Sequence, residues 1–161
     1  MENKVNFLEW SDITRIVNNM AIEIKKSYKP DIIISVVRGG MVPSVILSHL
    51  LNVRNVENIK AKETVSDEIN AQKQEIVIEE NINLKKIKGK KVLIVDDILG
   101  SGQTIRKIKE VTKKWSPKDI KVAICMINED NWEKSNNGEY KNIIDYLGEK
   151  IRGWVVFPWE K

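Results

Sequence analysis

Two adjacent aspartates, Asp96 and Asp97, follow the apolar run 92–95. Neighbouring carboxylates repel each other, so their charged forms need a cation or hydroxyl donors close by. Magnesium prefers oxygen ligands, and a vicinal diol can donate hydrogen bonds to carboxylates. The pair therefore indicates a site for Mg²⁺ together with a substrate that carries neighbouring hydroxyl groups.

Small and hydroxyl-bearing residues come next, over the start of a predicted helix. They are Gly100, Ser101, Gly102, Gln103 and Thr104. Unpaired backbone N–H groups and the positive end of the helix dipole bind phosphate at such a position. The spacing is not that of a P-loop, which needs Gly-x-x-x-x-Gly-Lys-Ser/Thr. An acidic pair followed by a phosphate cradle fits a sugar phosphate.

A second loop carries Arg38, Gly39 and Gly40 after another apolar run. Adjacent glycines let the backbone approach a ligand closely or adopt strained angles, and an arginine offers a fork of donors to phosphate. A tight structural turn would explain the glycines equally well. This loop alone leaves a phosphate site and a simple turn both open.

The elements that carry these loops alternate between strand and helix. Short apolar runs rich in β-branched residues predict buried strands; they are 32–37, 92–95 and 120–127, with weaker candidates at 53–60 and 75–79. This alternation predicts an α/β domain with a mainly parallel sheet flanked by helices. Ligands of such sheets bind beyond the carboxyl ends of the strands, where both loops lie.

Helical spacing of apolar residues predicts the helices between these strands. We expect Ser11 to cap the first helix, Pro43 to lie near the start of the second, and Ile105 and Ile108 to belong to the third. Residues 62–73 are polar and without a period, which predicts a mobile loop.

The bulk properties exclude several classes of protein. The 161 residues suit one domain, and no apolar run reaches the roughly 20 residues that span a bilayer. The excess of 27 basic over 23 acidic residues gives a net charge of +4. This charge is too small and too scattered to predict nucleic-acid binding. The lysine cluster at 85–91 is interpreted as a solvated segment that leads into a strand.

The only cysteine, Cys125, lies in an apolar run, as a small buried hydrophobe would. Because the chain also lacks a signal-peptide pattern, we expect the cytoplasm.

Three segments together resemble a known family. The run 92–104 resembles the phosphoribosyl-pyrophosphate (PRPP) motif of the type I phosphoribosyltransferases, and 37–43 resembles their pyrophosphate loop. The ending 154–160 resembles the purine-binding tail of the bacterial xanthine-guanine and archaeal purine enzymes. The resemblance implies a type I phosphoribosyltransferase fold: a single domain over 1–161, with a core at about 28–130 and a small hood from the N-terminal segment and about 131–161.

The resemblance also implies an activity. The enzyme would transfer the 5-phosphoribosyl group from PRPP to a free purine base, giving a nucleoside monophosphate and pyrophosphate, with Mg²⁺ as cofactor. Asp96 and Asp97 would be catalytic, holding the ribose hydroxyls and supporting the positive charge that develops on the ring, with Mg²⁺ bound through those hydroxyls or water. Residues 100–104 would wrap the 5′-phosphate. Arg38 and Gly39 would bind pyrophosphate, with a non-proline cis peptide between them.

The expected base site combines the tail with the strand that ends near 127. Trp154 would stack on the base, and the Val155 backbone would read its edge. Two positions depart from the 6-oxopurine pattern: Gly100 stands where an aspartate usually faces purine N7, and Ile127 or Asn128 stands where a lysine meets the 6-oxo group. Asn128 can donate or accept, so it suits an amino as well as an oxo group. The base therefore stays open between a 6-oxopurine and adenine.

Other readings are weaker. A PRPP-sensing regulator without catalysis usually adds a nucleic-acid-binding module or a basic face, and a uracil or orotate enzyme conflicts with the tail. We expect a homodimer with no membrane or nucleic-acid partner. His49, the only histidine, is expected to be structural and partly buried, and Trp115 and Trp132 to be packing or interface residues.

Overall fold

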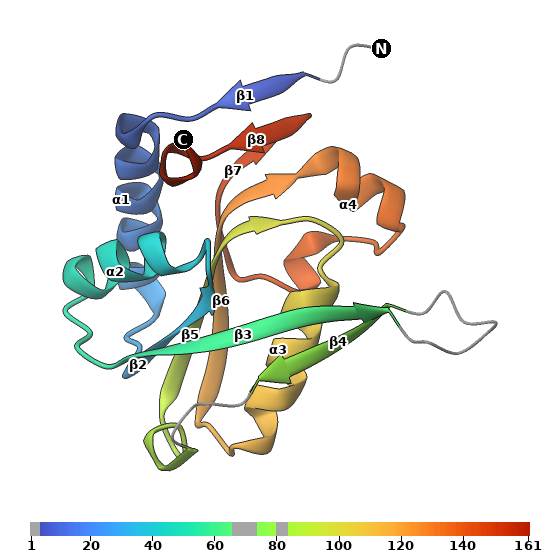
Figure 1. The fold of residues 1–161 in the computed structure, drawn as a ribbon. Helices are drawn as coiled ribbons and strands as arrows, with labels where there is room; N and C mark the ends of the chain where they lie inside the picture. Colours follow the sequence, from blue (N-terminus) through green and yellow to red (C-terminus); the bar gives the residue numbers. More distant parts are fainter. Residues whose placement is uncertain (1–3, 66–73, 80–83) are drawn as a thin grey trace.

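The structure, a computed structural model, describes residues 4–65, 74–79 and 84–161. Figure 1 shows a central sheet with helices on both faces and a separate pair of strands at one end of the molecule. The central sheet has six strands in the order β4-β3-β2-β5-β6-β7. These strands are Gln74–Glu79 (β4), Val56–Val65 (β3), Ile32–Val37 (β2), Lys91–Leu99 (β5), Asp119–Asn128 (β6) and Tyr146–Ile151 (β7).

All neighbouring strands of this sheet are parallel, except β3 and β4. The predicted α/β class with a mainly parallel sheet is therefore confirmed. The helices are Trp10–Ser27 (α1), Met41–Leu50 (α2), Gln103–Lys114 (α3) and Glu129–Ser135 (α4), with single 3₁₀ turns at Leu84–Lys86, Tyr140–Asn142 and Pro158–Glu160. None of the helices in the described part of the chain is long and apolar enough to cross a membrane.

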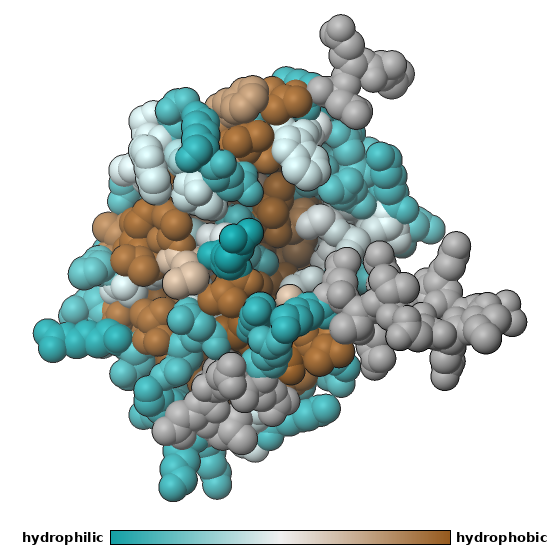
Figure 2. All heavy atoms as spheres, in the orientation of Figure 1, coloured by the Kyte–Doolittle hydropathy of each residue, from teal (hydrophilic) through white to brown (hydrophobic). Residues whose placement is uncertain are grey.

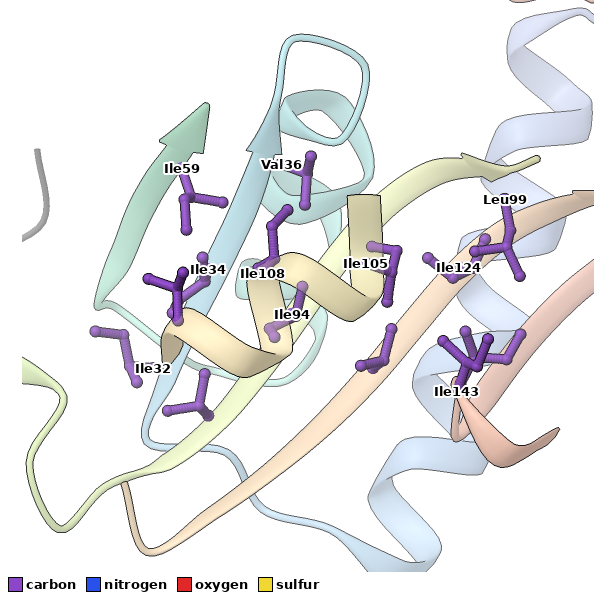
Figure 3. Packing of buried hydrophobic residues seen from close by; sticks show 14 of the residues in the cluster. Ile32, Ile34, Val36, Ile59, Ile94, Leu99, Ile105, Ile108, Ile124 and Ile143 are labelled. Atoms are coloured by element: carbon purple, nitrogen blue, oxygen red, sulfur yellow. The ribbon is translucent and has the colours of Figure 1, made fainter. Parts of the chain in front are cut away.

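The core has two layers, one on each face of the sheet. Ile32, Ile34 and Ile94 face α3 and pack with Ile105 and Ile108, as Figure 3 shows. The residues between them along the strands, such as Ile33 and Leu93, pack on the other face with α1 and α2. Because successive side chains of a strand point to opposite faces, strands covered on both sides need unbroken apolar runs. This explains why these strands could be predicted from sequence.

The chain termini come together in a second, two-stranded sheet. Val5–Phe7 (β1) pairs in parallel with Trp154–Val156 (β8), with Val5 opposite Trp154. The β1–β8 pair lies next to the carboxyl end of β6. The Asn128 side chain at the end of β6 donates a 2.8 Å hydrogen bond to the carbonyl of Gly153, just before β8. In Figure 1, β1 and β8 lie side by side at the top of the view.

Several local predictions need correction. The weak strand expected at 53–60 is β3, which continues to Val65, so residues 62–65 belong to a strand and not to the expected loop; 66–73 lie outside the described residues. Ser11 does not cap α1. The N-cap is Glu9, whose backbone N–H donates to the Asp12 carboxylate at 2.9 Å.

The C-terminal quarter holds the largest difference. Residues 131–161 were expected to form part of the hood, yet β7 is the edge strand of the central sheet and pairs with β6. The short helix α4 and strand β1 were also not predicted. An edge strand is covered less completely than a central one, so Tyr146–Ile151 lacks the continuous apolar run that marks the inner strands.

Candidate active site

Asp96 and Asp97 lie within β5, which continues past them to Leu99. We expected the strand to end at the pair, but its hydrogen-bonded register with β6 persists to Leu99 opposite Ile127. The Asp97 backbone N–H donates to the Asp96 carboxylate at 2.9 Å. The sheet therefore holds the backbone of both aspartates rigidly.

Both carboxyl groups are poorly hydrated. The pKa of Asp96 is raised well above its ordinary value, chiefly by burial and then by the neighbouring charge of Asp97. Burial also raises the pKa of Asp97. Keeping both charged therefore costs free energy unless a cation or hydroxyl donors bind them.

The Arg38-Gly39-Gly40 loop lies directly against this pair. A Cβ atom on Gly39 would be 1.8 Å from the Asp97 Oδ2 atom, and one on Gly40 would be 2.6 Å from the Val95 carbonyl oxygen. Only glycine fits both positions. The structure thus brings together two loops that are about sixty residues apart in sequence.

The same loop contains a non-proline cis peptide, between Val37 and Arg38. We expected it one residue later, between Arg38 and Gly39, so that prediction was wrong in position. The Arg38 side chain is exposed, and it has no ion-pair partner among the residues that the structure describes.

Residues 100–104 form a turn into the N-terminus of α3. Gly102 has a φ of 79°, and a Cβ atom there would be 2.9 Å from a ring carbon of Trp132, so this position requires glycine. The Ser101 hydroxyl accepts a 3.5 Å hydrogen bond from the Gln103 backbone N–H. The N–H groups of a first helical turn have no intrahelical acceptor, which makes this turn an anion cradle.

The tail supplies one wall of a neighbouring cavity of about 730 Å³. Asn128, Asn131 and Trp154 are among its lining residues. The Trp154 side chain is 68% exposed although it is a large apolar group, whereas Val155 beside it is buried. An exposed indole at a cavity offers a flat surface on which a planar ring can stack.

The Val155 backbone is free of the β1–β8 pairing. The Trp154 N–H donates to the Lys4 carbonyl, and the Leu8 N–H donates to the Val156 carbonyl. Since alternate residues of a strand bond to the same neighbour, the Val155 N–H and C=O point away from β1. Both groups can therefore bond to a ligand.

Asn128 is more constrained than we expected. Its amide nitrogen donates to the Gly153 carbonyl at 2.8 Å, and its amide oxygen accepts from the Asn131 N–H at 3.1 Å. The side chain thereby caps α4 and ties it to the segment before β8. One N–H and one lone pair of the amide remain for a ligand.

The other residues singled out from the sequence have structural positions, and one of them, Trp132, packs against Gly102 of the 100–104 turn. Trp115 and Trp132 are buried packing residues, as expected. Cys125 is fully buried, which raises the pKa of its thiol. His49 is exposed at the last turn of α2 and not partly buried, because it faces away from the sheet.

Two residues of this region carried no sequence signal. Arg152 forms ion pairs with Glu129, Asp130 and Glu133 of α4, and Asn131 lines the cavity beside Trp154. Both lie in polar, charged stretches with no motif. Only the folded arrangement brings them to the site.

Comparison with known proteins agrees with this geometry. The model of the phosphoribosyl transferase domain family matches residues 5–160. The chain is 24% identical to the hypoxanthine-guanine phosphoribosyltransferase of Schizosaccharomyces pombe, over 96% of this chain and 88% of that protein. It is also 24% identical to the xanthine-guanine phosphoribosyltransferase of Idiomarina loihiensis, over 98% and 88%. The crystal structure of a purine phosphoribosyltransferase from Pyrococcus horikoshii superimposes with a TM-score of 0.78 at 31% identity, covering 98% of this chain and 94% of that one.

Proposed function

The chain belongs to the phosphoribosyltransferase family, and on that premise we propose that it is a purine phosphoribosyltransferase of the 6-oxopurine subgroup. It transfers the 5-phosphoribosyl group from PRPP to a free purine base and releases pyrophosphate, as in purine salvage. The observation that carries the proposal is the contact of Gly39 with Asp97, next to the phosphate-binding turn at 100–104. Ribose, pyrophosphate and 5′-phosphate then have adjacent sites.

The carboxylate pair acts on the ribose. Asp96 and Asp97 accept hydrogen bonds from the 2′- and 3′-hydroxyls and stabilise the positive charge that develops on the ring as pyrophosphate leaves. Their poor hydration strengthens this interaction, because charges interact more strongly where water is excluded. The same pair would hold the substrate's magnesium ion through the hydroxyls or water.

The donor set fits Mg²⁺ shared with a substrate. The described residues contain no cluster of three or more His, Cys, Asp or Glu side chains that could hold a metal ion. Magnesium is commonly bound by one or two carboxylates plus substrate oxygens and water. When bound, Mg²⁺ would neutralise the charge on the pyrophosphate.

The two ends of PRPP meet different loops. The turn at 100–104 binds the 5′-phosphate through backbone N–H groups and the hydroxyls of Ser101 and Thr104. Arg38 and the Gly39 backbone bind the pyrophosphate, and the exposed guanidinium of Arg38 reaches it as a charged donor.

The purine lies against the tail. Trp154 stacks on the ring, and the outward-facing N–H and C=O of Val155 bond to its edge. The relatives named above favour a 6-oxopurine. Gly100 favours the alternative, adenine, because it lacks the carboxylate that 6-oxopurine enzymes carry at this position.

A panel of bases tests the proposal. The protein is incubated with PRPP, Mg²⁺ and each of hypoxanthine, guanine, xanthine and adenine, and nucleotide and pyrophosphate are measured. Turnover with an oxopurine is expected. Turnover with adenine alone would favour the adenine enzyme, and PRPP binding without turnover on any base would favour a sensing protein.

We further propose that the enzyme is a cytoplasmic homodimer. The first and second turns of α2 expose Met41 and Val45, which are 43% and 54% accessible, and Figure 2 shows hydrophobic residues gathered over this helix. A buried, unpaired cysteine suits a reducing compartment. Light scattering across a range of protein concentrations tests the dimer, and a monomer at all of them would contradict it.

A further inference from the structure

The space beside Gly100 is open. A Cβ atom there would meet nothing closer than the Asn131 side chain, with Nδ2 at 3.9 Å and Cβ at 4.0 Å, and the φ of Gly100 lies outside the left-handed region. Neither packing nor backbone conformation therefore requires glycine. By contrast, Gly39 and Gly102 are closely surrounded by other atoms. The open space at position 100 leaves the Asn131 amide facing the site.

The backbone of Asn131 is firmly placed. Its N–H donates to the Asn128 amide oxygen at 3.1 Å, in the first turn of α4. Asp130 beside it accepts from the Gly153 N–H at 2.7 Å and pairs with Arg152 at 2.9 Å. Among the described residues, the Asn131 side-chain amide itself makes no hydrogen bond. It is thus a positioned polar group with unused donors.

Asn131 lies between two cavities. It lines the cavity that contains Trp154, and it also lines a cavity of about 470 Å³ that contains Ser101 and Gln103 of the phosphate-binding turn. A nucleotide places its base and its 5′-phosphate on either side of the ribose. A residue shared by both cavities therefore lies near the base edge that points toward the phosphate-binding turn.

We propose that Asn131 is the residue that reads the N7 and O6 edge of the purine, in the space that Gly100 leaves open; this rests on the proposed function. The Nδ2 group directed at that space donates hydrogen bonds. Oxopurines offer acceptors at both N7 and O6, whereas adenine offers an acceptor at N7 and a donor at its amino group. Asn131, which lies on α4, thereby favours oxopurines although position 100 carries no carboxylate.

Binding measurements test this assignment without depending on turnover. Calorimetry measures the affinity of wild type and Asn131→Ala for IMP, GMP, AMP and ribose 5-phosphate. The loss of hydrogen bonds to the base should weaken IMP and GMP about five- to tenfold. Ribose 5-phosphate, which has no base, should bind within about twofold of wild type. Asn131→Asp, which replaces the donor by an acceptor and suits the first turn of a helix, should weaken IMP and GMP at least as much.

Matched controls separate the outcomes. Asn19→Ala removes another exposed asparagine, on α1, and should change neither affinity. Unchanged IMP and GMP affinity in Asn131→Ala would overturn the assignment, and so would an equal loss for ribose 5-phosphate, since that shows a structural role. Failure of the proposed function looks different: the wild type then forms no nucleotide from any base.

Discussion

At the scale of single residues, the aspartate pair makes the firmest prediction about turnover. Asp97→Asn removes a charge that stabilises the developing positive charge on ribose, while the amide keeps the size of the side chain. Turnover should fall by roughly 10²–10³-fold, with an unchanged circular dichroism spectrum. Steady-state assays with the preferred base check this, and near-normal turnover would refute the role of Asp97.

The neighbouring aspartate, Asp96, makes the stability of the folded protein depend on pH. Because the pKa of Asp96 is raised in the folded protein, the folded state binds a proton more tightly than the unfolded one, and stability falls as pH rises through that pKa. Asp96→Asn removes the free-energy cost of charging this carboxyl group. In metal-free buffer at neutral pH, the melting temperature of the variant should therefore exceed that of the wild type by roughly 2–4 °C for each kcal/mol of that cost. The gain should disappear at acidic pH, where Asp96 is protonated. A lower melting temperature at neutral pH would contradict the free-energy cost of charging this poorly hydrated carboxyl group.

One added methyl group should be harmful at one glycine of the site and tolerated at another. Gly39→Ala places a Cβ atom against the Asp97 carboxylate, so it should displace that group and cut turnover at least about a hundredfold. Gly100→Ala enters open space and should retain folding and PRPP binding. Kinetics and thermal melts of the two variants decide this. Equal tolerance at both positions would show that the Gly39 loop moves freely.

At the scale of elements, Arg152 connects α4 to the segment that carries Trp154. Its ion pairs with three acidic residues of α4 fix that helix against β8. Arg152→Ala should raise the KM for the base several-fold and leave the KM for PRPP unchanged, since the phosphate-binding turn lies on α3. Arg54→Ala, at an exposed position away from α4, is the matched control. An equal rise in both KM values would mean that the ion pairs support the whole site.

The elements also show what sequence could and could not predict. β2 and β5 are buried on both faces, so their apolar runs could be identified without a structure. α4 contains one buried residue, Trp132, among charged ones, and β1 has three residues that pair only with β8. Such elements form through contacts that are distant in sequence, and a local pattern cannot contain them. The same limit explains why sequence motifs could suggest Asp96, Asp97 and the 100–104 turn as site residues, whereas Asn131 could be proposed only from the folded arrangement.

At the scale of the whole molecule, the uncompensated carboxylates predict that substrate stabilises the fold. A ligand at 100 times its Kd adds about 2.7 kcal/mol to the free energy of unfolding, which is roughly 5–10 °C for a chain of this size. PRPP with Mg²⁺ should therefore raise the melting temperature, and a chelator should reduce the shift. Calorimetric melts check this, and no shift at saturating PRPP would contradict a PRPP site.

The pairing of β1 with β8 has a consequence for biosynthesis. β1 is synthesised about 150 residues before the strand with which it pairs. The backbone N–H groups of β1 therefore remain without their β8 partners for on the order of ten seconds. The inner strands β2, β3 and β5 of the sheet are synthesised during that time, whereas the wall that carries Trp154 is not. A nascent chain would thus possess its phosphate-binding turn before the strand that completes its base site.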